Sequence, residues 1–171
     1  MKTIENHIVN RKSSNRKSLP TFMHIIITRY HESPEETKSE ITIDGVSFGE
    51  AREPGTASYR QRGKTKCLIR LPEATYQCRI TASDFSPMTL KVRRSPGQGS
   101  IYIGWDPLAP WRSGIICIGQ GDPLSPPEER ELTDRKGTFE RFTQRLYKAF
   151  QRGEKITLEI CRFLINGLTK Q

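Results

Sequence analysis

The chain of 171 residues lacks any long apolar run. A helix that crosses a membrane needs about eighteen consecutive apolar residues, and no run in this sequence approaches that length. The first segment is basic but has no continuous apolar core, so we expect no secretory signal peptide. Apolar residues make up 34% of the chain and cluster in short runs. The length predicts one domain that can bury a core, with or without a tail.

Residue types that bind metals are scarce and poorly spaced. The histidines all lie near the N-terminus: His7, His24 and His31. The cysteines have no C-x-x-C spacing and each lies in a strand-like apolar run: Cys67, Cys78, Cys117 and Cys161. Metal ligands usually come in close pairs, so we expect no metal site and no cofactor. Without a signal peptide, buried reduced thiols are expected rather than disulfides.

Acidic residues are fewer than basic ones, which predicts an anionic partner. The net charge is +9, from 28 Lys and Arg against 19 Asp and Glu. Five basic residues and one glutamate give residues 1–22 a net +4, which leaves +5 for the rest. Nucleic acid, an anionic lipid surface and an anionic cell-wall polymer all fit this surplus. There is no zinc-finger spacing and no aromatic signature of an RNA-binding module. The candidate basic contacts are Arg11, Lys12, Arg16, Lys17, Arg93 and Arg94.

Short apolar or alternating segments predict a mainly β fold. Residues 23–31 form a β-rich run, and Asp44-Gly45 between two alternating segments is a strong hairpin signal. Polar connections are expected from Glu50 to Lys66 and from Gln120 to Gly137. Further strand-like runs are bounded by Pro, Gly, Ser or Asp. These runs are 67–72, 75–81, 90–94, 100–105, 115–119 and 155–165.

One amphipathic helix is predicted near the C-terminus. Phe139, Phe142, Leu146 and Phe150 share one stripe in "TFERFTQRLYKAF", with Tyr147 beside it. Thr138 can cap the start of this helix, and Gly153 suits its end. Strands followed by a packed helix and a last strand predict an α+β domain that is mainly β. We expect a small antiparallel sheet or barrel-like domain with this helix packed on it.

Several motifs occur in an order that resembles a known family. They are the hairpin Ile43-Asp44-Gly45, the strand start "LPEATY" at 71–76 and the closing strand "GEKITLEI" at 153–160. Together they resemble an uncharacterised family of small phage- and bacteria-borne domains of unknown function. The resemblance covers 23–160, so we expect the residues before Met23 to be an extension or to result from an upstream start codon. We expect a basic leader without fixed structure over 1–22, one β-rich domain over 23–162, and a C-terminal tail over 163–171. The expected location is the cytoplasm of a bacterial host or a phage particle.

The centre of that family is an "IH.GN……GC" signature, which resembles the Cys-His site of L,D-transpeptidases. Histidine and cysteine on neighbouring strands suit thiol nucleophilic catalysis. This sequence departs from the signature, because Gly104 stands at the histidine position and Ile115 at the cysteine position. Cys117 is two residues further on and is a weak candidate nucleophile, since no histidine follows His31 to serve as its base.

The segment "SIYIGWDPLAPWRSGIICIG" therefore predicts a binding groove whose catalytic residues have been lost. Its candidate contacts are Trp105, Asp106, Trp111 and Arg112. The leading hypothesis is a non-catalytic binding or accessory module that contacts cell-wall glycopeptide or another protein. Two alternatives remain open at this point. One is a nucleic-acid-binding protein that uses its basic surface and leader, and the other is a cysteine-dependent transpeptidase- or hydrolase-like enzyme that uses Cys117.

Overall fold

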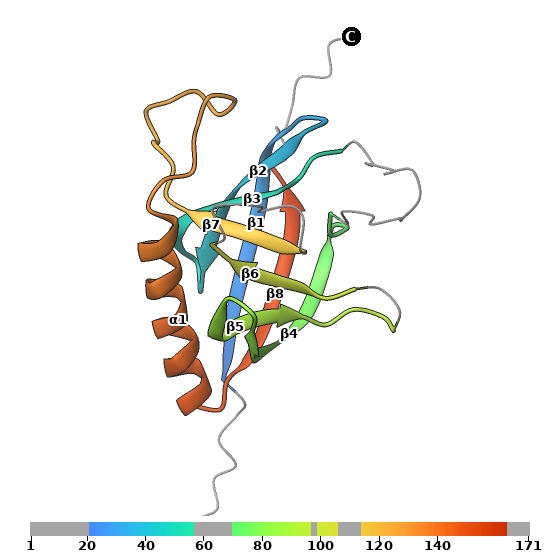
Figure 1. Ribbon diagram of the computed structural model, residues 1–171, viewed down its shortest axis with the longest axis vertical. Helices are drawn as coiled ribbons and strands as arrows, with labels where there is room; N and C mark the ends of the chain where they lie inside the picture. The colour runs from blue at the N-terminus through green and yellow to red at the C-terminus, as the bar shows by residue number, and fades with distance from the viewer. Residues whose placement is uncertain (1–20, 57–69, 97–98, 106–113, 164–171) are drawn as a thin grey trace, which may run out of the picture.

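A computed structural model describes residues 21–56, 70–96, 99–105 and 114–163 of the chain. Eight strands form one closed barrel in the order β1-β2-β3-β7-β6-β5-β4-β8, and one helix packs against it (Figure 1). The prediction of a mainly β, barrel-like domain with one helix near the C-terminus is confirmed. The elements are β1 (Phe22–Glu32), β2 (Glu36–Ile43), β3 (Val46–Pro54), β4 (Ala74–Ser83), β5 (Ser86–Val92), β6 (Ile101–Gly104), β7 (Ile115–Gly119), α1 (Arg135–Gln151) and β8 (Lys155–Arg162).

The barrel closes through its last strand. Strand β8 lies between β1 and β4, parallel to β1 and antiparallel to β4. Strands β6 and β7 form the second parallel pair, and the remaining neighbours are antiparallel. The predicted turn between β2 and β3 places Asp44 at φ 52° and Gly45 at φ 79°. Two successive positive φ angles are typical of the type I′ turns that join hairpin strands, and Asp-Gly is a favoured pair for them.

Alternate residues of the strands fill the barrel interior. Eight-stranded barrels have an interior just wide enough for side chains to fill, and this one is a packed apolar core. The buried apolar strand residues of this core are Met23, Ile25, Ile27, Ile41, Ile43, Ala51, Leu90, Val92, Ile101, Ile103, Ile116, Ile118, Ile156, Leu158 and Ile160. Residues between them, such as Cys117 on β7 and Arg52 on β3, lie on the outer face of the wall.

The expected polar connection from Glu50 to Lys66 is wrong at its start, because β3 continues to Pro54. Four consecutive residues, from Glu50 to Glu53, are buried there although three of them are charged. Glu53 faces the interior and is paired with Arg29, while Glu50 and Arg52 are paired on the outer face. Glu53 and Arg52 have ion-pair partners on other segments, which are not visible in the local sequence. The polar composition of this stretch therefore predicted a loop instead of a strand.

Helix α1 begins at Arg135, four residues earlier than a cap at Thr138 predicts. Asp134 is the N-cap residue, with φ 41° and no capping hydrogen bond from its side chain. Thr138 is therefore not the cap; it is buried inside the first turns, and Gln120 and Arg141 both donate hydrogen bonds to its hydroxyl. Phe150 is also misplaced by the stripe prediction, since it is 65% exposed and Ala149 is buried instead. Gly153 follows the helix with φ +65°, as the sequence predicted.

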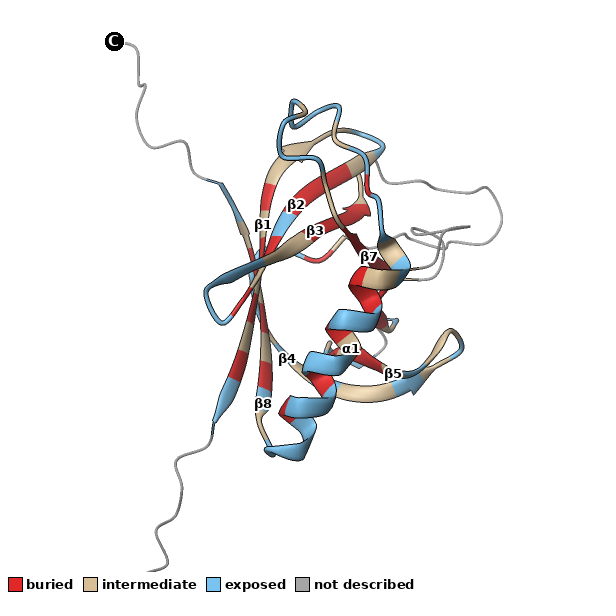
Figure 2. Cartoon of the chain, turned by 90° about the vertical axis from the view of Figure 1, so that its left-hand side faces the viewer, coloured by how far each residue is buried: buried red, intermediate tan, exposed pale blue. Residues whose placement is uncertain are grey.

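The buried face of α1 joins the barrel core (Figure 2). Phe142 packs on Phe48 of β3 with ring centroids 6.0 Å apart, and Phe139 packs on Phe85 between β4 and β5 at 6.1 Å. Phe48 is the extra residue of a register shift in which Ile41 pairs with Gly49 and Thr42 pairs with Ser47. Such bulges re-aim a side chain, and here the bulge supplies an aromatic contact for the helix. Within the described ranges, no helix is long and apolar enough to cross a membrane.

Candidate functional site

The topology brings the two signature positions together. Strands β6 and β7 are parallel neighbours, and Gly104 and Ile115 are both buried. A Cβ atom added to Gly104 would lie 2.9 Å from Ile115 Cγ2 and 2.9 Å from Phe85 Cε2. These distances are shorter than a carbon–carbon contact, so a histidine here would require neighbouring side chains to move. Gly104, Ile115 and Phe85 therefore form a close apolar contact.

Cys117 has no histidine beside it among the residues that the structure describes. It is 1% exposed and lies on the outer face of β7. Cross-strand pairing runs from His31 to Lys38, from Lys38 to Arg52, and from Arg52 to Cys117. His31 is therefore three strand spacings from Cys117, about 14 Å, which is beyond direct proton transfer. His24 lies elsewhere, with Nε2 3.2 Å from Oε2 of Glu159 on β8.

A set of buried and half-buried polar side chains lies on the outer face around β3, and we call it the Glu50 cluster: Tyr30, Lys38, Glu50, Arg52 and Arg130. Tyr30 Oη donates to Glu50 Oε2 at 2.8 Å, and Arg52 Nη1 donates to the same oxygen at 3.1 Å. Arg130 Nη1 donates to Glu50 Oε1 at 3.4 Å. Glu50 therefore accepts hydrogen bonds from three other members of the cluster.

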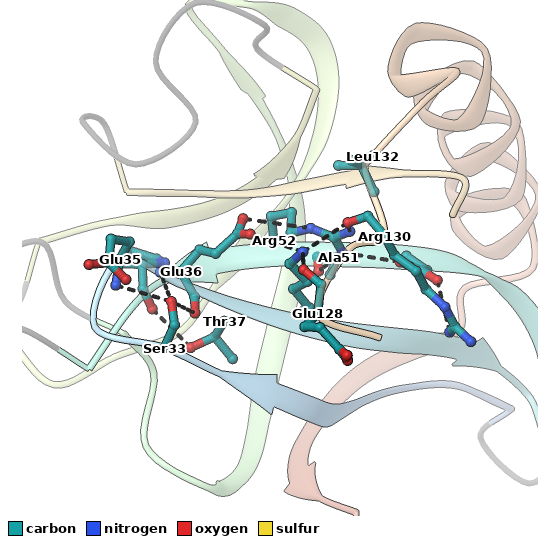
Figure 3. Close-up of polar contacts among 12 residues, drawn as sticks. Ser33, Glu35, Glu36, Thr37, Ala51, Arg52, Glu128, Arg130 and Leu132 are labelled. Atoms are coloured by element: carbon teal, nitrogen blue, oxygen red, sulfur yellow. Dashed lines mark hydrogen bonds and ion pairs between the residues drawn. The ribbon is translucent and has the colours of Figure 1, made fainter. Parts of the chain in front are cut away.

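The Glu50 cluster fixes the segment between β7 and α1 against the barrel. Arg52 Nη2 donates to the Arg130 carbonyl at 2.7 Å, and Lys38 Nζ donates to the same carbonyl at 3.0 Å. Figure 3 shows Arg52 lying between Glu36 and the segment that carries Arg130. Burial, followed by the hydrogen bond to Glu50, raises the pKa of Tyr30 to about 12, so its hydroxyl remains a donor. The arrangement anchors this segment to the barrel.

A turn in the segment between β7 and α1 is stabilised by hydrogen bonds to the Asp122 side chain. Asp122 accepts hydrogen bonds from the Leu124 N–H and from the Ser125 hydroxyl, both at 2.9 Å. These bonds favour the ionised carboxylate and hold the pKa of Asp122 below its usual range.

A groove beside the Gly104–Ile115 contact has the features of a ligand site, and we call it the helix groove. Its volume is about 650 Å³. It lies between α1 and the β4–β5 hairpin and is lined by Phe85, Ser86, Pro87, Met88, Trp105, Lys136, Phe139, Glu140, Thr143, Gln144, Tyr147, Lys148 and Gln151. Phe85 contacts the site of a Gly104 Cβ and also lines the groove, so the two features are continuous. Ligand sites are typically concave and lined by apolar and aromatic side chains, with a few polar groups.

Of the predicted groove contacts, Trp105 lies in the helix groove and is half-buried. Asp106, Trp111 and Arg112 lie outside the described residues, as do Arg11, Lys12, Arg16 and Lys17. Arg93 and Arg94 follow β5 and line a separate cleft. The sequence interpretation missed Phe85, Met88 and the polar helix residues. In the sequence, the position of Tyr147 beside the apolar stripe of the helix was the one indication that this helix surface lines a binding groove.

The described thiols do not form a metal site. Cys78, Cys117 and Cys161 are not in disulfides, and no group of three or more His, Cys, Asp or Glu in the described ranges could hold a metal ion. Burial raises the pKa of Cys78 to about 12, so this thiol is neutral near pH 7. Thiolate chemistry at Cys78 is therefore suppressed.

No protein-family model, curated protein or solved structure matches this chain.

Proposed function

We propose that this protein is a non-catalytic binding module, a degenerate relative of the phage- and bacteria-borne Cys/His family, which binds its ligand in the helix groove. The place of action is a phage particle or its bacterial host. The ligand class is cell-wall glycopeptide, the substrate class of the transpeptidases whose signature the sequence resembles.

The observation that carries this proposal is the contact at Gly104. The two signature positions are neighbours, as a catalytic pair requires, but Gly104, Ile115 and Phe85 fill the space between them. Cys117 cannot replace the missing pair with one of the described histidines, because His24 and His31 both lie on β1, which β2 and β3 separate from β7. A thiol at its ordinary pKa of about 8.5 is only a few per cent thiolate at neutral pH, so it needs such a partner.

The helix groove suits a ligand that has both sugar and peptide parts. Trp105, Phe85 and Tyr147 offer aromatic faces, on which the apolar face of a sugar ring can pack. Lys136 and Lys148 supply positive charge at the same groove for peptide carboxylates, against one acidic residue, Glu140. Tyr147 is 51% exposed and is therefore available for contact without rearrangement.

The test is the affinity of the full chain for a purified disaccharide-peptide fragment of peptidoglycan, measured by isothermal titration calorimetry in low salt. Tyr147→Ala removes an aromatic wall and should weaken binding about tenfold, equivalent to about 1.4 kcal/mol. The matched control is Phe150→Ala, which also removes an exposed aromatic ring of α1 but one that does not line the groove. We expect the control to change the affinity less than twofold.

Equal effects of the two substitutions would contradict a groove site. If the unmodified chain fails to bind the fragment in low salt, the cell-wall ligand is excluded.

A further inference from the structure

A second cleft is lined by positive charge and lies away from the helix groove. We call it the basic cleft; its volume is about 680 Å³, and it is lined by Arg79, Lys91, Val92, Arg93, Arg94, Ser95, Gly99 and Ser100. Half of these residues are cationic, two carry hydroxyls, and none of the described lining residues is acidic. It shares no residue with the helix groove.

The strand register places like charges side by side in this cleft. Arg79 on β4 and Lys91 on β5 are direct cross-strand partners, and Arg93 is two residues further along the same face. Like charges directly opposite one another destabilise a sheet. Among the described residues, none of the ion pairs involves Arg79, Lys91 or Arg93. The charges that would neutralise them are therefore not supplied by the described part of the barrel.

Two further contacts shape the cleft. Arg94 Nη1 donates to the Gly99 carbonyl at 3.2 Å and joins the end of β5 to the segment before β6. Lys91 Nζ lies 5.6 Å from the centroid of the Tyr102 ring on β6, which positions the ammonium group by a cation–π contact. The exposed guanidinium groups of Arg79 and Arg93 remain accessible to an anion.

We infer that the basic cleft binds the phosphate backbone of single-stranded nucleic acid without reading its sequence. Several cations along one cleft match a polymer with one negative charge per nucleotide better than they match a single small anion. Guanidinium groups pair with phosphate oxygens through two hydrogen bonds, and Ser95 and Ser100 add hydroxyl donors at the same cleft. Phosphate contacts of this kind fix position but carry no base information. The net charge of +9 adds a long-range attraction.

The test uses a fluorescein-labelled 20-residue oligothymidine and the full chain, with fluorescence anisotropy measured from 50 to 300 mM NaCl. Arg79→Gln/Arg93→Gln should weaken binding at least tenfold at 100 mM NaCl. Two lost phosphate contacts should also reduce the slope of log affinity against log salt by about 1.4 for a single strand. The matched control is Arg145→Gln/Lys155→Gln, which removes the same charge from exposed positions outside the cleft. We expect the control to weaken binding less than threefold.

If the two double variants lose the same affinity for the oligonucleotide, the loss comes from net charge alone, and the inference is overturned. An unchanged affinity in the cleft variant would assign the binding to other basic residues, such as those of 1–22. Displacement of the oligonucleotide by 10 mM inorganic phosphate at constant ionic strength would show a site for a single phosphate instead. Failure of the unmodified chain to bind the oligonucleotide at 50 mM NaCl would also overturn the inference.

Discussion

Glu53→Gln is expected to lower the free energy of unfolding by about 3–5 kcal/mol, the usual cost of breaking a buried ion pair. Arg29 Nε and Nη2 donate to the two carboxylate oxygens of Glu53 at 2.9 and 2.7 Å, and both side chains are at most 2% exposed. Gln keeps the shape of Glu53 but removes its charge, which leaves the Arg29 cation buried without a counter-charge. Urea unfolding followed by circular dichroism measures the change.

Two variants show whether the cost comes from the unpaired charge. Arg29→Met/Glu53→Leu removes both charges and should recover most of the loss, because apolar replacement of a whole buried pair is often tolerated. Arg162→Gln breaks the ion pairs to Glu32 and Glu73 at a side chain that is 54% exposed, and it should cost less than about 1 kcal/mol. A Glu53→Gln cost as small as that of Arg162→Gln would contradict this account of the barrel interior.

Glu50→Ala is expected to cost about 3 kcal/mol, because it leaves buried donors of the Glu50 cluster without their acceptor. Glu50 is 6% exposed and receives hydrogen bonds from Tyr30, Arg52 and Arg130. The segment between β7 and α1 should also become more sensitive to limited proteolysis, since Arg130 is one of its anchors. Urea unfolding and the cleavage rate of that segment are the measurements.

The matched control is Glu40→Ala. Glu40 is the cross-strand partner of Glu50 on β2, but it is exposed. Surface substitutions usually change stability by about 0.5 kcal/mol or less. If Glu40→Ala costs as much as Glu50→Ala, or if the segment resists proteolysis in both, then the cluster does not anchor it.

Local sequence signals predicted the parts of this fold that depend on local physics. The Asp44-Gly45 turn requires positive φ angles that this dipeptide supplies, and the alternation of apolar residues in β1 and β8 follows from their one buried face. The stripe of Phe139, Phe142 and Leu146 correctly predicted the buried side of α1.

The parts that the sequence did not predict depend on distant partners. The charged end of β3 is a strand because Glu53 meets Arg29 and Arg52 meets the Arg130 carbonyl, and neither contact is visible in a local window. The helix groove combines Phe85 from one hairpin with Tyr147 from α1, and the basic cleft depends on the register of Arg79 against Lys91. The approach of Gly104 to Ile115 likewise requires the parallel pairing of β6 with β7.

The alkylation rate of Cys117 tests most directly the claim that catalysis has been lost. The full chain is treated with iodoacetamide from pH 6 to 10, and the Cys117 peptide is quantified by mass spectrometry. Because the thiol is 1% exposed and no described histidine lies beside it, we predict slow labelling near pH 7 that accelerates only when the chain is unfolded by urea. Rapid labelling of the folded chain that titrates well below the free-thiol pKa of about 8.5, and that disappears in His24→Ala or His31→Ala, would contradict the account.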